Sequence, residues 1–272
     1  MTAVASYADA KAARGRWLLR IEDVDKPRCS RIAEIEILRQ LAAYGFEHDG
    51  EVVRQSERGD VYDAALMRLS EAGHLFACTC TRKQLELAQR NREGETVYPG
   101  TCRNRIKSPA GAHAFRVRIP APQDAAVAFV DRLCGAISQN LATDVGDFVL
   151  RRADSLYAYQ LAVVVDDALQ GVTHVVRGED LLLNTSRQIF LQRLLGYPPV
   201  AYMHVPLVRN DAGEKLSKQT RAAPIHVDDA LATLHRAWAF LKQTPVGDVR
   251  TTADFWRQAA EIWAPVPALV RG

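Results

Sequence analysis

The chain has 272 residues, of which 48% are hydrophobic and 25% are charged, and its formal net charge is +3. This composition is typical of a soluble protein with one or two domains and a sizeable core. Since no apolar run reaches the roughly 18 residues of a membrane helix and the Ala-rich start lacks the layout of a secretory signal, we expect a cytoplasmic protein with no membrane partner.

Hydrophobic periodicity and turn signals predict alternating helices and strands along most of the chain. Helices are predicted at 3–13, 30–44, 57–72, 157–168, 184–195, 227–242 and 251–263. Strands are predicted at 17–22, 114–119, 127–133, 172–176 and 203–208. This alternation, interrupted by a cysteine-rich segment after residue 77, predicts an α/β fold with a parallel sheet and a smaller domain inserted into it.

The five cysteines are an odd number, and three of them are clustered: Cys29, Cys78, Cys80, Cys102 and Cys134. This usage indicates a reducing compartment and a metal site rather than a disulfide framework. Cys78, Cys80 and Cys102 can supply three thiolates to zinc. The nearby candidates for a fourth ligand are His74, His113 and Tyr98, and the alternative is a set of three buried, inert thiols.

The segment from Cys78 to Arg118 is strongly basic. It contains nine Lys/Arg and three acidic residues, an excess of six positive charges. A basic surface of this size can bind nucleic-acid phosphates by releasing counterions. The alternative is an ordinary solvated surface.

Polar residues follow two of the predicted strands. Glu22 ends the stretch "RWLLRIE" and can hold a substrate ammonium, unless it belongs to a solvated acidic loop. Arg177 lies in "VVRGED", where its guanidinium can form either a surface salt bridge or a pair with a substrate carboxylate. Because ligands bind at the carboxyl ends of parallel strands, we expect both residues near one crevice. Tyr159, in an apolar run, is by itself typical of a core residue.

The stretch "DAGEKLSKQT" at 211–220 carries Lys215 and Lys218 three residues apart, among glycine and small polar residues. This spacing holds two ammonium groups close together, as binding of a polyphosphate requires. Stabilising a transferring phosphoryl group takes donors from more than one side, so we expect a second group of donors elsewhere.

Three stretches in this order carry a family resemblance: "LRIEDVDKPR", "YAYQLAVVVDDALQGVTHVVRGEDLLLNTSRQIFLQRLLGYPP" and "KLSKQ". They resemble the catalytic core of class I glutamyl-tRNA synthetases, from about residue 5 to about residue 240. "KLSKQ" is similar to the Lys-Met-Ser-Lys-Ser loop of that class, with Leu216 for methionine and Gln219 for the last serine. Only 52 residues follow Thr220, too few for a large anticodon-binding region, so the closest resemblance is to the short glutamyl-Q tRNA(Asp) synthetases.

The resemblance implies a Rossmann-type catalytic domain with an inserted zinc-binding subdomain and C-terminal helices. The implied divisions are 1–76 and 145–205 for the two halves of the catalytic domain, 77–144 for the tRNA-contacting insert, and 206–272 for the lysine loop and C-terminal helices. The implied reaction is ATP-dependent, tRNA-independent activation of L-glutamate and its transfer to queuosine at the wobble position of tRNA(Asp). We expect a monomer.

The site residues follow from the resemblance, residue by residue. Glu22, Tyr159 and Arg177 would bind L-glutamate. Lys215, Ser217 and Lys218 would contact ATP, which enters with Mg, and Lys218 would be the catalytic group. One structural zinc per chain would be held by Cys78, Cys80, Tyr98 and Cys102, so that the resemblance selects Tyr98 as the fourth ligand.

The same resemblance places the partner of the lysine loop in an N-terminal strand with Arg-Phe-Ala-Pro-Ser and a His-x-Gly motif at a helix start. The 272 residues contain neither. We therefore expect that Met1 is a misassigned start, that the first strand of the sheet is missing, and that the working protein has an N-terminal extension. The alternatives are a catalytic-core fragment of a glutamyl-tRNA synthetase and an inactive, zinc-stabilised tRNA-binding paralogue.

Overall fold

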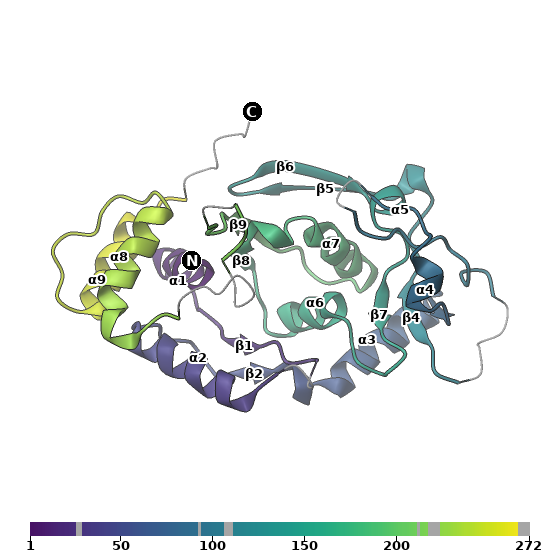
Figure 1. Cartoon of the computed structure of the whole chain (residues 1–272), viewed down its shortest axis with the longest axis horizontal. Helices are drawn as coiled ribbons and strands as arrows, with labels where there is room; N and C mark the ends of the chain where they lie inside the picture. Colours follow the sequence, from purple (N-terminus) through teal and green to yellow (C-terminus); the bar gives the residue numbers. More distant parts are fainter. Residues whose placement is uncertain (26–28, 92–93, 106–110, 211–212, 217–223, 266–272) are drawn as a thin grey trace.

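The computed structural model describes residues 1–25, 29–91, 94–105, 111–210, 213–216 and 224–265, and Figure 1 shows the arrangement of its elements. The helices are α1 (Thr2–Ala12), α2 (Arg31–Ala43), α3 (Gly59–Glu71), α4 (Arg82–Leu85), α5 (Leu141–Asp144), α6 (Tyr159–Leu169), α7 (Asn184–Leu194), α8 (Ala230–Phe240) and α9 (Thr252–Ile262). The strands are β1 (Arg20–Ile21), β2 (Val53–Arg54), β3 (Leu75–Cys78), β4 (Ala114–Val117), β5 (Ala126–Asp131), β6 (Gly135–Asn140), β7 (Val149–Arg151), β8 (His174–Gly178) and β9 (Ala201–Val205).

The strands of the described residues form three sheets. β1 and β2 pair in parallel, and β3, β4 and β7 form an antiparallel sheet. The third sheet has the order β6-β5-β9-β8, in which β9 runs parallel to both β5 and β8 while β5 and β6 are antiparallel. The predicted α/β class is confirmed, but the predicted parallel sheet is a mixed one, and a separate sheet is antiparallel. The reason is that β6 follows β5 after a tight turn, which only an antiparallel pair allows.

Each of the seven predicted helices is present, as α1, α2, α3, α6, α7, α8 and α9. Local signals explain some of their ends. The Ser30 hydroxyl accepts a hydrogen bond from the N–H of Ala33 at the start of α2, and Gly45, with φ of +72°, follows its end. No helix in the described part of the chain is long and apolar enough to cross a membrane.

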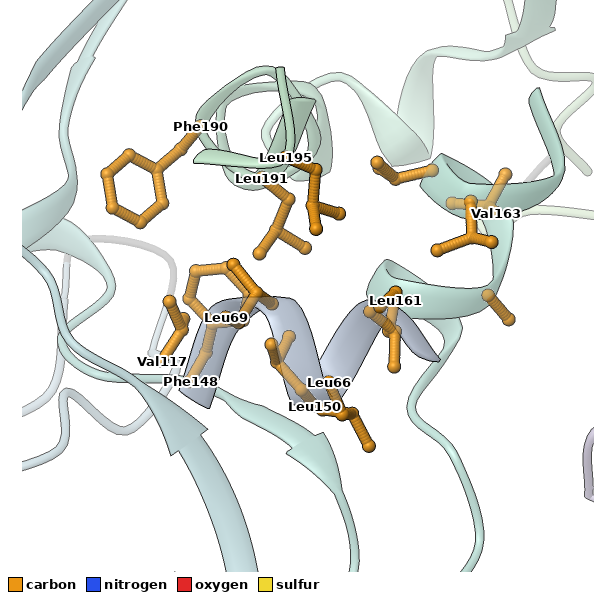
Figure 2. Close-up of a cluster of buried hydrophobic side chains, with 14 of the residues drawn as sticks. Leu66, Leu69, Val117, Phe148, Leu150, Leu161, Val163, Phe190, Leu191 and Leu195 are labelled. Atoms are coloured by element: carbon orange, nitrogen blue, oxygen red, sulfur yellow. The ribbon is translucent and has the colours of Figure 1, made fainter. Parts of the chain in front are cut away.

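The first hydrophobic core lies among α3, α6, α7 and the antiparallel sheet (Figure 2). Leu69 of α3, Leu150 of β7, Leu161 of α6 and Leu191 of α7 are at most 1% exposed. Full burial of such a side chain stabilises the fold by about 1.5–3 kcal/mol. This core therefore fixes α6, whose first residue is one of the candidate site residues.

The second core joins α1, α8 and α9 to β9, and it contains all four tryptophans. Trp17, Trp238 and Trp256 are buried, and Trp263 packs against them. Tyr7 meets the rings of Trp17 and Trp256 edge-on, with ring centroids 5.3 and 4.7 Å apart. Such pairs add about 0.5–1.5 kcal/mol to the gain from burial. The N-terminal helix and the two C-terminal helices are thereby held together.

Helix α2 leaves part of its apolar face exposed. Ile32 is 81% exposed and Ile35 is 58% exposed. Its buried residue is Glu34, which forms ion pairs with Arg31 at 2.9 Å and with Arg54 at 2.8 Å. In the described structure, ion pairs therefore tie α2 to the segment that contains β2.

Candidate active site

Three residues singled out from the sequence line a single cavity of about 680 Å³. Glu22 directly follows β1, Tyr159 is the first residue of α6, and Arg177 lies in β8. Both β1 and β8 contribute their neighbouring residues to the wall, and α1 contributes Asp9. The three residues thus share one cavity, which runs along β8 and the segment that leads into β1.

Arg177 is a buried cation at the wall of this cavity and is only 6% exposed. Its Nε donates to His204 Nε2 at 3.0 Å, and its Nη2 donates to Thr185 Oγ1 at 2.7 Å. Its Nη1 is 3.5 Å from the hydroxyl of Tyr159. Among the residues that the structure describes, no carboxylate lies within 4.0 Å of the guanidinium. Because buried charges are normally paired, this guanidinium is suited to receive a carboxylate from a ligand.

Glu22 lies in a polar corner of the same cavity. Its Oε1 is 3.3 Å from Arg20 Nη2, and Arg20 in turn pairs with Asp167 at 2.8 Å. Burial raises the pKa of the Glu22 carboxyl, and the charge of Arg20 partly opposes this effect. The side chain stays 40% exposed along the open side of the cavity, while protein groups surround its other sides. An incoming ammonium group would offset this burial and favour the ionised carboxylate.

Tyr159 is held in place through its helix. Asp166 of α6 is fully buried and accepts hydrogen bonds from Arg58 Nε at 2.6 Å and from the Tyr62 hydroxyl at 2.8 Å, so that α6 is fastened to α3. Burial, followed by the charge of Glu22, raises the pKa of Tyr159. The Tyr159 hydroxyl therefore stays protonated at neutral pH and can donate a hydrogen bond to a ligand.

The lysine-containing loop is described only in part. Lys215 Nζ is 2.6 Å from Asp180 Oδ2, in the turn that follows β8. Lys215 is half-exposed and is not among the residues that line the cavity. Ser217 and Lys218 lie outside the described residues, so their contacts with ATP stay predictions.

The cysteines of the insert form a compact group. The Sγ atoms of Cys78, Cys80 and Cys102 all lie within 4.8 Å of one another, and those of Cys80 and Cys102 are 3.6 Å apart. Thiolates around a tetrahedral zinc ion are separated by about 3.8 Å. Although burial alone would raise it, hydrogen bonds from the backbone of Thr79 and from the Tyr98 hydroxyl lower the pKa of Cys102 to about 7. The group therefore fits a metal ion in spacing, and Cys102 readily supplies a thiolate, although burial raises the pKa of Cys80.

Tyr98 is the fourth side chain in this cluster. Its hydroxyl oxygen is 3.4 Å from Cys78 Sγ and 3.7 Å from Cys80 Sγ, and it accepts the N–H of Cys102 at 2.9 Å. Within the described ranges, neither His74 nor His113 joins the group. The phenol oxygen thus lies within 3.7 Å of two of the thiols, and it can complete a tetrahedral set.

Two neighbours hold Tyr98 against the cysteines. Gly146 has φ of +70°, and a Cβ at this position would lie 2.7 Å from the backbone nitrogen of Tyr98, so only glycine fits. The guanidinium of Arg116 lies 4.0 Å from the centre of the Tyr98 ring. The attraction between this cation and the face of the ring helps to hold Tyr98 in place.

The basic residues of the insert fall into two groups. Arg103 pairs with the buried Asp147 at 2.6 Å, and Arg116 donates to the backbone carbonyl of Asp147. In contrast, Lys83 and Arg105 are exposed. Part of the positive charge therefore supports the fold, and another part faces solvent.

Sequence reasoning did not single out three polar residues around the cavity. Asp167 binds Arg20, and His204 binds Arg177 and the buried carboxylate of Asp131. The available signal was an ionisable residue inside an apolar run, "VVVDD" for Asp167 and "MHV" for His204.

Comparisons with known proteins identify the relatives of this chain. Residues 1–239 match the family model for the catalytic domain of class I tRNA synthetases (E and Q). The chain is 55% identical over 253 residues to a glutamyl-Q tRNA(Asp) synthetase of Thiobacillus denitrificans, covering 93% of this chain and 83% of the relative. It is 52% identical over 267 residues to the glutamyl-Q tRNA(Asp) synthetase of Dechloromonas aromatica, covering 97% and 88%.

Among solved structures, a glutamate tRNA ligase from Elizabethkingia meningosepticum, crystallised with its amino acid, has a TM-score of 0.78 and 22% sequence identity. The match covers 98% of this chain and 62% of the ligase chain. The glutamate-tRNA synthetase of Elizabethkingia anophelis has a TM-score of 0.76 at 21% identity, over 99% of this chain and 64% of that one. At this level of identity the likeness establishes the fold.

Proposed function

Because this chain belongs to the family of glutamyl-Q tRNA(Asp) synthetases, within the class I tRNA synthetases for glutamate and glutamine, we propose that it activates L-glutamate with ATP and transfers the glutamyl group to queuosine in tRNA(Asp). The α-carboxylate of glutamate attacks the α-phosphate of ATP, the bond to pyrophosphate breaks, and glutamyl-adenylate forms. The hydroxyl-bearing ring of queuosine then attacks the glutamyl carbonyl, and AMP leaves. No protein nucleophile is needed, because the carboxylate of the substrate is itself the nucleophile. The rate enhancement comes from positioning of the substrates and from electrostatic stabilisation of the transition state.

The observation that carries this proposal is the buried Arg177 guanidinium beside the cavity. In our assignment it pairs with a carboxylate of glutamate, Tyr159 donates its hydroxyl, and Glu22 accepts from the α-ammonium group. Glutamine lacks the second carboxylate and would leave the guanidinium buried and unpaired, which is costly.

For ATP, we propose that Lys215, Ser217 and Lys218 bind the phosphates, with Lys218 as the catalytic group. Lys218 would neutralise negative charge as pyrophosphate leaves, together with the Mg that accompanies ATP. Lys215 supports the assignment, because its contact with Asp180 brings the loop close to the end of β8.

We propose that Cys78, Cys80, Tyr98 and Cys102 hold one zinc ion per chain. All four ligands would be protein groups, which makes the zinc structural rather than catalytic. We also propose the division of the chain into 1–76, 77–144, 145–205 and 206–272, with the exposed basic residues of the insert facing tRNA. In the described residues, the hairpin of β5 and β6 lies within 77–144 and joins the sheet of β9.

The function is tested with the full-length gene product, radiolabelled glutamate and ATP. Label should appear on tRNA(Asp) that contains queuosine and not on the same tRNA without it. Label on the 3′ end of tRNA(Glu) would instead support a glutamyl-tRNA synthetase. An absence of label on any tRNA, in a protein that binds tRNA, would support the inactive paralogue.

Amino-acid choice is tested by ATP–pyrophosphate exchange. Glutamate should support exchange and glutamine should not, and R177A should lose most of the exchange with glutamate. Equal exchange with glutamine would contradict the role of Arg177.

A further inference from the structure

Behind Arg177 lies a buried pair of ionisable side chains that do not line the cavity. Arg177 in β8 is the direct neighbour of His204 in β9, because the two parallel strands pair in register at these residues. The side chains of His204 and Asp131 are fully buried, and His204 Nδ1 is 2.6 Å from Asp131 Oδ2. The Arg177 Nε donates to the other nitrogen of the same imidazole at 3.0 Å. The three side chains thus form a continuous line into the sheet.

Asp131 is fixed by the turn that follows β5. Its Oδ1 accepts the backbone N–H groups of Leu133 at 2.9 Å and Cys134 at 2.8 Å. Burial would raise the pKa of this carboxyl, but the hydrogen bonds from His204 and from the backbone outweigh burial and lower it to about 2. Asp131 is therefore ionised and offers only acceptors to its neighbours.

This carboxylate determines which imidazole nitrogen of His204 carries the proton. Since Asp131 can only accept, the Nδ1 of His204 must donate to it. Since the Nε of Arg177 can only donate, the Nε2 of His204 must accept from it. Both conditions are met by a single form of the ring, the neutral imidazole with its proton on Nδ1. The Thr185 hydroxyl lies 3.2 Å from the same Nε2 and fits this form of the ring by donating to it.

We propose that Asp131 and His204 are positioning residues for amino-acid recognition, which act by fixing the orientation of the Arg177 guanidinium. His204 and Thr185 occupy Nε and Nη2, so that Nη1, beside Tyr159, is left for the ligand. The inference rests on the proposed function, because it takes a carboxylate of glutamate as the partner of Arg177. Neither Asp131 nor His204 touches the substrate in this account.

The sharpest test is D131N in the full-length protein, because it changes no volume. The Oδ1 position of the side chain must still accept the N–H groups of Leu133 and Cys134, so the new NH₂ group faces His204. The imidazole then has to accept at Nδ1 and carry its proton on Nε2, where it meets the N–H of Arg177. We expect KM for glutamate to rise about tenfold or more, the size expected for losing one hydrogen bond to a charged group. KM for ATP should change by less than about twofold, because the phosphate contacts are untouched.

The matched control is Y202F. Tyr202 is the strand neighbour of Asp131, and its ring lies beside that of His204 with centroids 6.2 Å apart. The substitution removes the hydrogen bond from Gln192 in the same buried layer but leaves the donors and acceptors of Asp131, His204 and Arg177 in place. A rise in KM for glutamate in D131N that is absent from Y202F supports the inference. Equal behaviour of the two variants overturns it.

R177A separates this inference from the proposed function. If R177A raises KM for glutamate and D131N does not, the positioning role alone is wrong. If R177A leaves KM for glutamate unchanged, the assignment of Arg177 is wrong and the inference falls with it.

If D131N does not fold, H204Q and H204N decide the question. A glutamine amide reaches the position of Nε2 and can still accept from Arg177, whereas an asparagine amide reaches only the position of Nδ1. A KM for glutamate closer to the wild-type value in H204Q than in H204N supports the inference. The reverse order, or equal values, overturns it.

Discussion

At the scale of single residues, the surroundings of Glu22 disfavour the charge that its proposed role requires. Burial raises the pKa of its carboxyl above the ordinary value of 4.5. A carboxyl whose pKa is raised on folding is easier to protonate in the folded state than in the unfolded state. Its ionisation therefore costs stability at every pH above the ordinary value, and binding of a cation removes this cost.

E22Q should consequently have opposite effects on stability and binding. At pH 7 the free energy of unfolding of the ligand-free protein should stay equal or rise, since the amide carries no charge to bury. KM for glutamate should rise about tenfold or more, because the ammonium loses a charged partner. In the wild type, glutamate affinity should fall as the pH falls through the raised pKa of Glu22. Chemical unfolding measures the stability, and the kinetics of ATP–pyrophosphate exchange measure KM for glutamate. If E22Q binds glutamate as the wild type does at all pH values, Glu22 does not bind the substrate.

The sequence predicted the residues that face the cavity better than those that support them. Glu22 and Arg177 were singled out because they lie where predicted strands end, and the family resemblance then gave them roles in binding glutamate. His204 and Asp131 could not be found in this way, since their meeting depends on the pairing of β5 with β9 and of β9 with β8. Asp131 and His204 are 73 residues apart in the chain, and Arg177 and His204 are 27 residues apart, so no local pattern records the register of these strands.

At the scale of elements, the cluster of Cys78, Cys80, Tyr98 and Cys102 joins the end of β3 to a loop that has little core of its own. The buried apolar group here consists of Phe76 and three of the cluster residues themselves. A metal ion in such a place supplies folding free energy that side-chain packing does not, of order 10 kcal/mol in small zinc domains.

C80S should therefore lose its metal and loosen residues 77–118. Elemental analysis should find about one zinc per chain in the wild type, and hydrogen exchange should report faster opening of this segment in the variant. C29S is the matched control, because Cys29 is exposed and lies outside the cluster. Full zinc occupancy in C80S would contradict the ligand set.

The two groups of basic residues in the insert lead to different expectations for charge reversal. R105E should weaken tRNA binding and reduce the slope of log affinity against log salt by about one or more, since an exposed cation contributes by counterion release. R103E should instead lower the melting temperature, because it places a carboxylate against the buried Asp147. If the slope of log affinity against log salt is unchanged in R105E, Arg105 does not contact the tRNA.

The short strands limited what the sequence could predict at this scale. The helices were predicted within a few residues, and some of them, such as α3 and α8, have clear 3.6-residue periodicity. In contrast, β2 and β7 have two and three residues, which is too short for a recognisable alternation. Only Arg20 and Ile21 of the strand predicted at 17–22 are paired, because their partner β2 is equally short. Strands as short as β1, β2 and β7 are formed by pairing with residues far away in the chain rather than by a local pattern.

At the scale of the whole molecule, one buried carboxylate joins distant parts of the chain. Asp9 of α1 accepts two hydrogen bonds from Arg132, at 2.6 and 2.8 Å, and one from Trp263 at 2.8 Å. Burial raises the pKa of Asp9, but the hydrogen bonds from Arg132 and Trp263 outweigh burial and leave it below 3.8. A lowered pKa stabilises the fold above the unfolded-state value and loses this contribution as the pH falls through the folded-state value.

D9N should therefore lower the free energy of unfolding at pH 7 by about 1–3 kcal/mol, because Arg132 loses its charged partner. The difference from the wild type should shrink as the pH falls below about 4 and then through the lowered folded-state pKa, because Asp9 is protonated first in the unfolded state and then in both states. D154N is the control, since Asp154 forms an exposed pair with Arg152 two residues away. Denaturant unfolding at pH 7 and below about pH 4 measures these differences. Equal effects of D9N and D154N would contradict the stabilising role of the contacts between Asp9, Arg132 and Trp263.

The placement of the tryptophans determines what a common optical measurement can see. All four lie in the core of α1, α8, α9 and β9, so tryptophan fluorescence reports on that core and not on the cysteine cluster. Release of the metal from the cysteine cluster should leave the tryptophan emission spectrum unchanged. If cobalt takes the place of zinc in this site, the same release should remove the cobalt–thiolate absorption bands. A sample judged intact by tryptophan melting curves can therefore have a disordered insert, and absorption or circular dichroism is needed to reveal it.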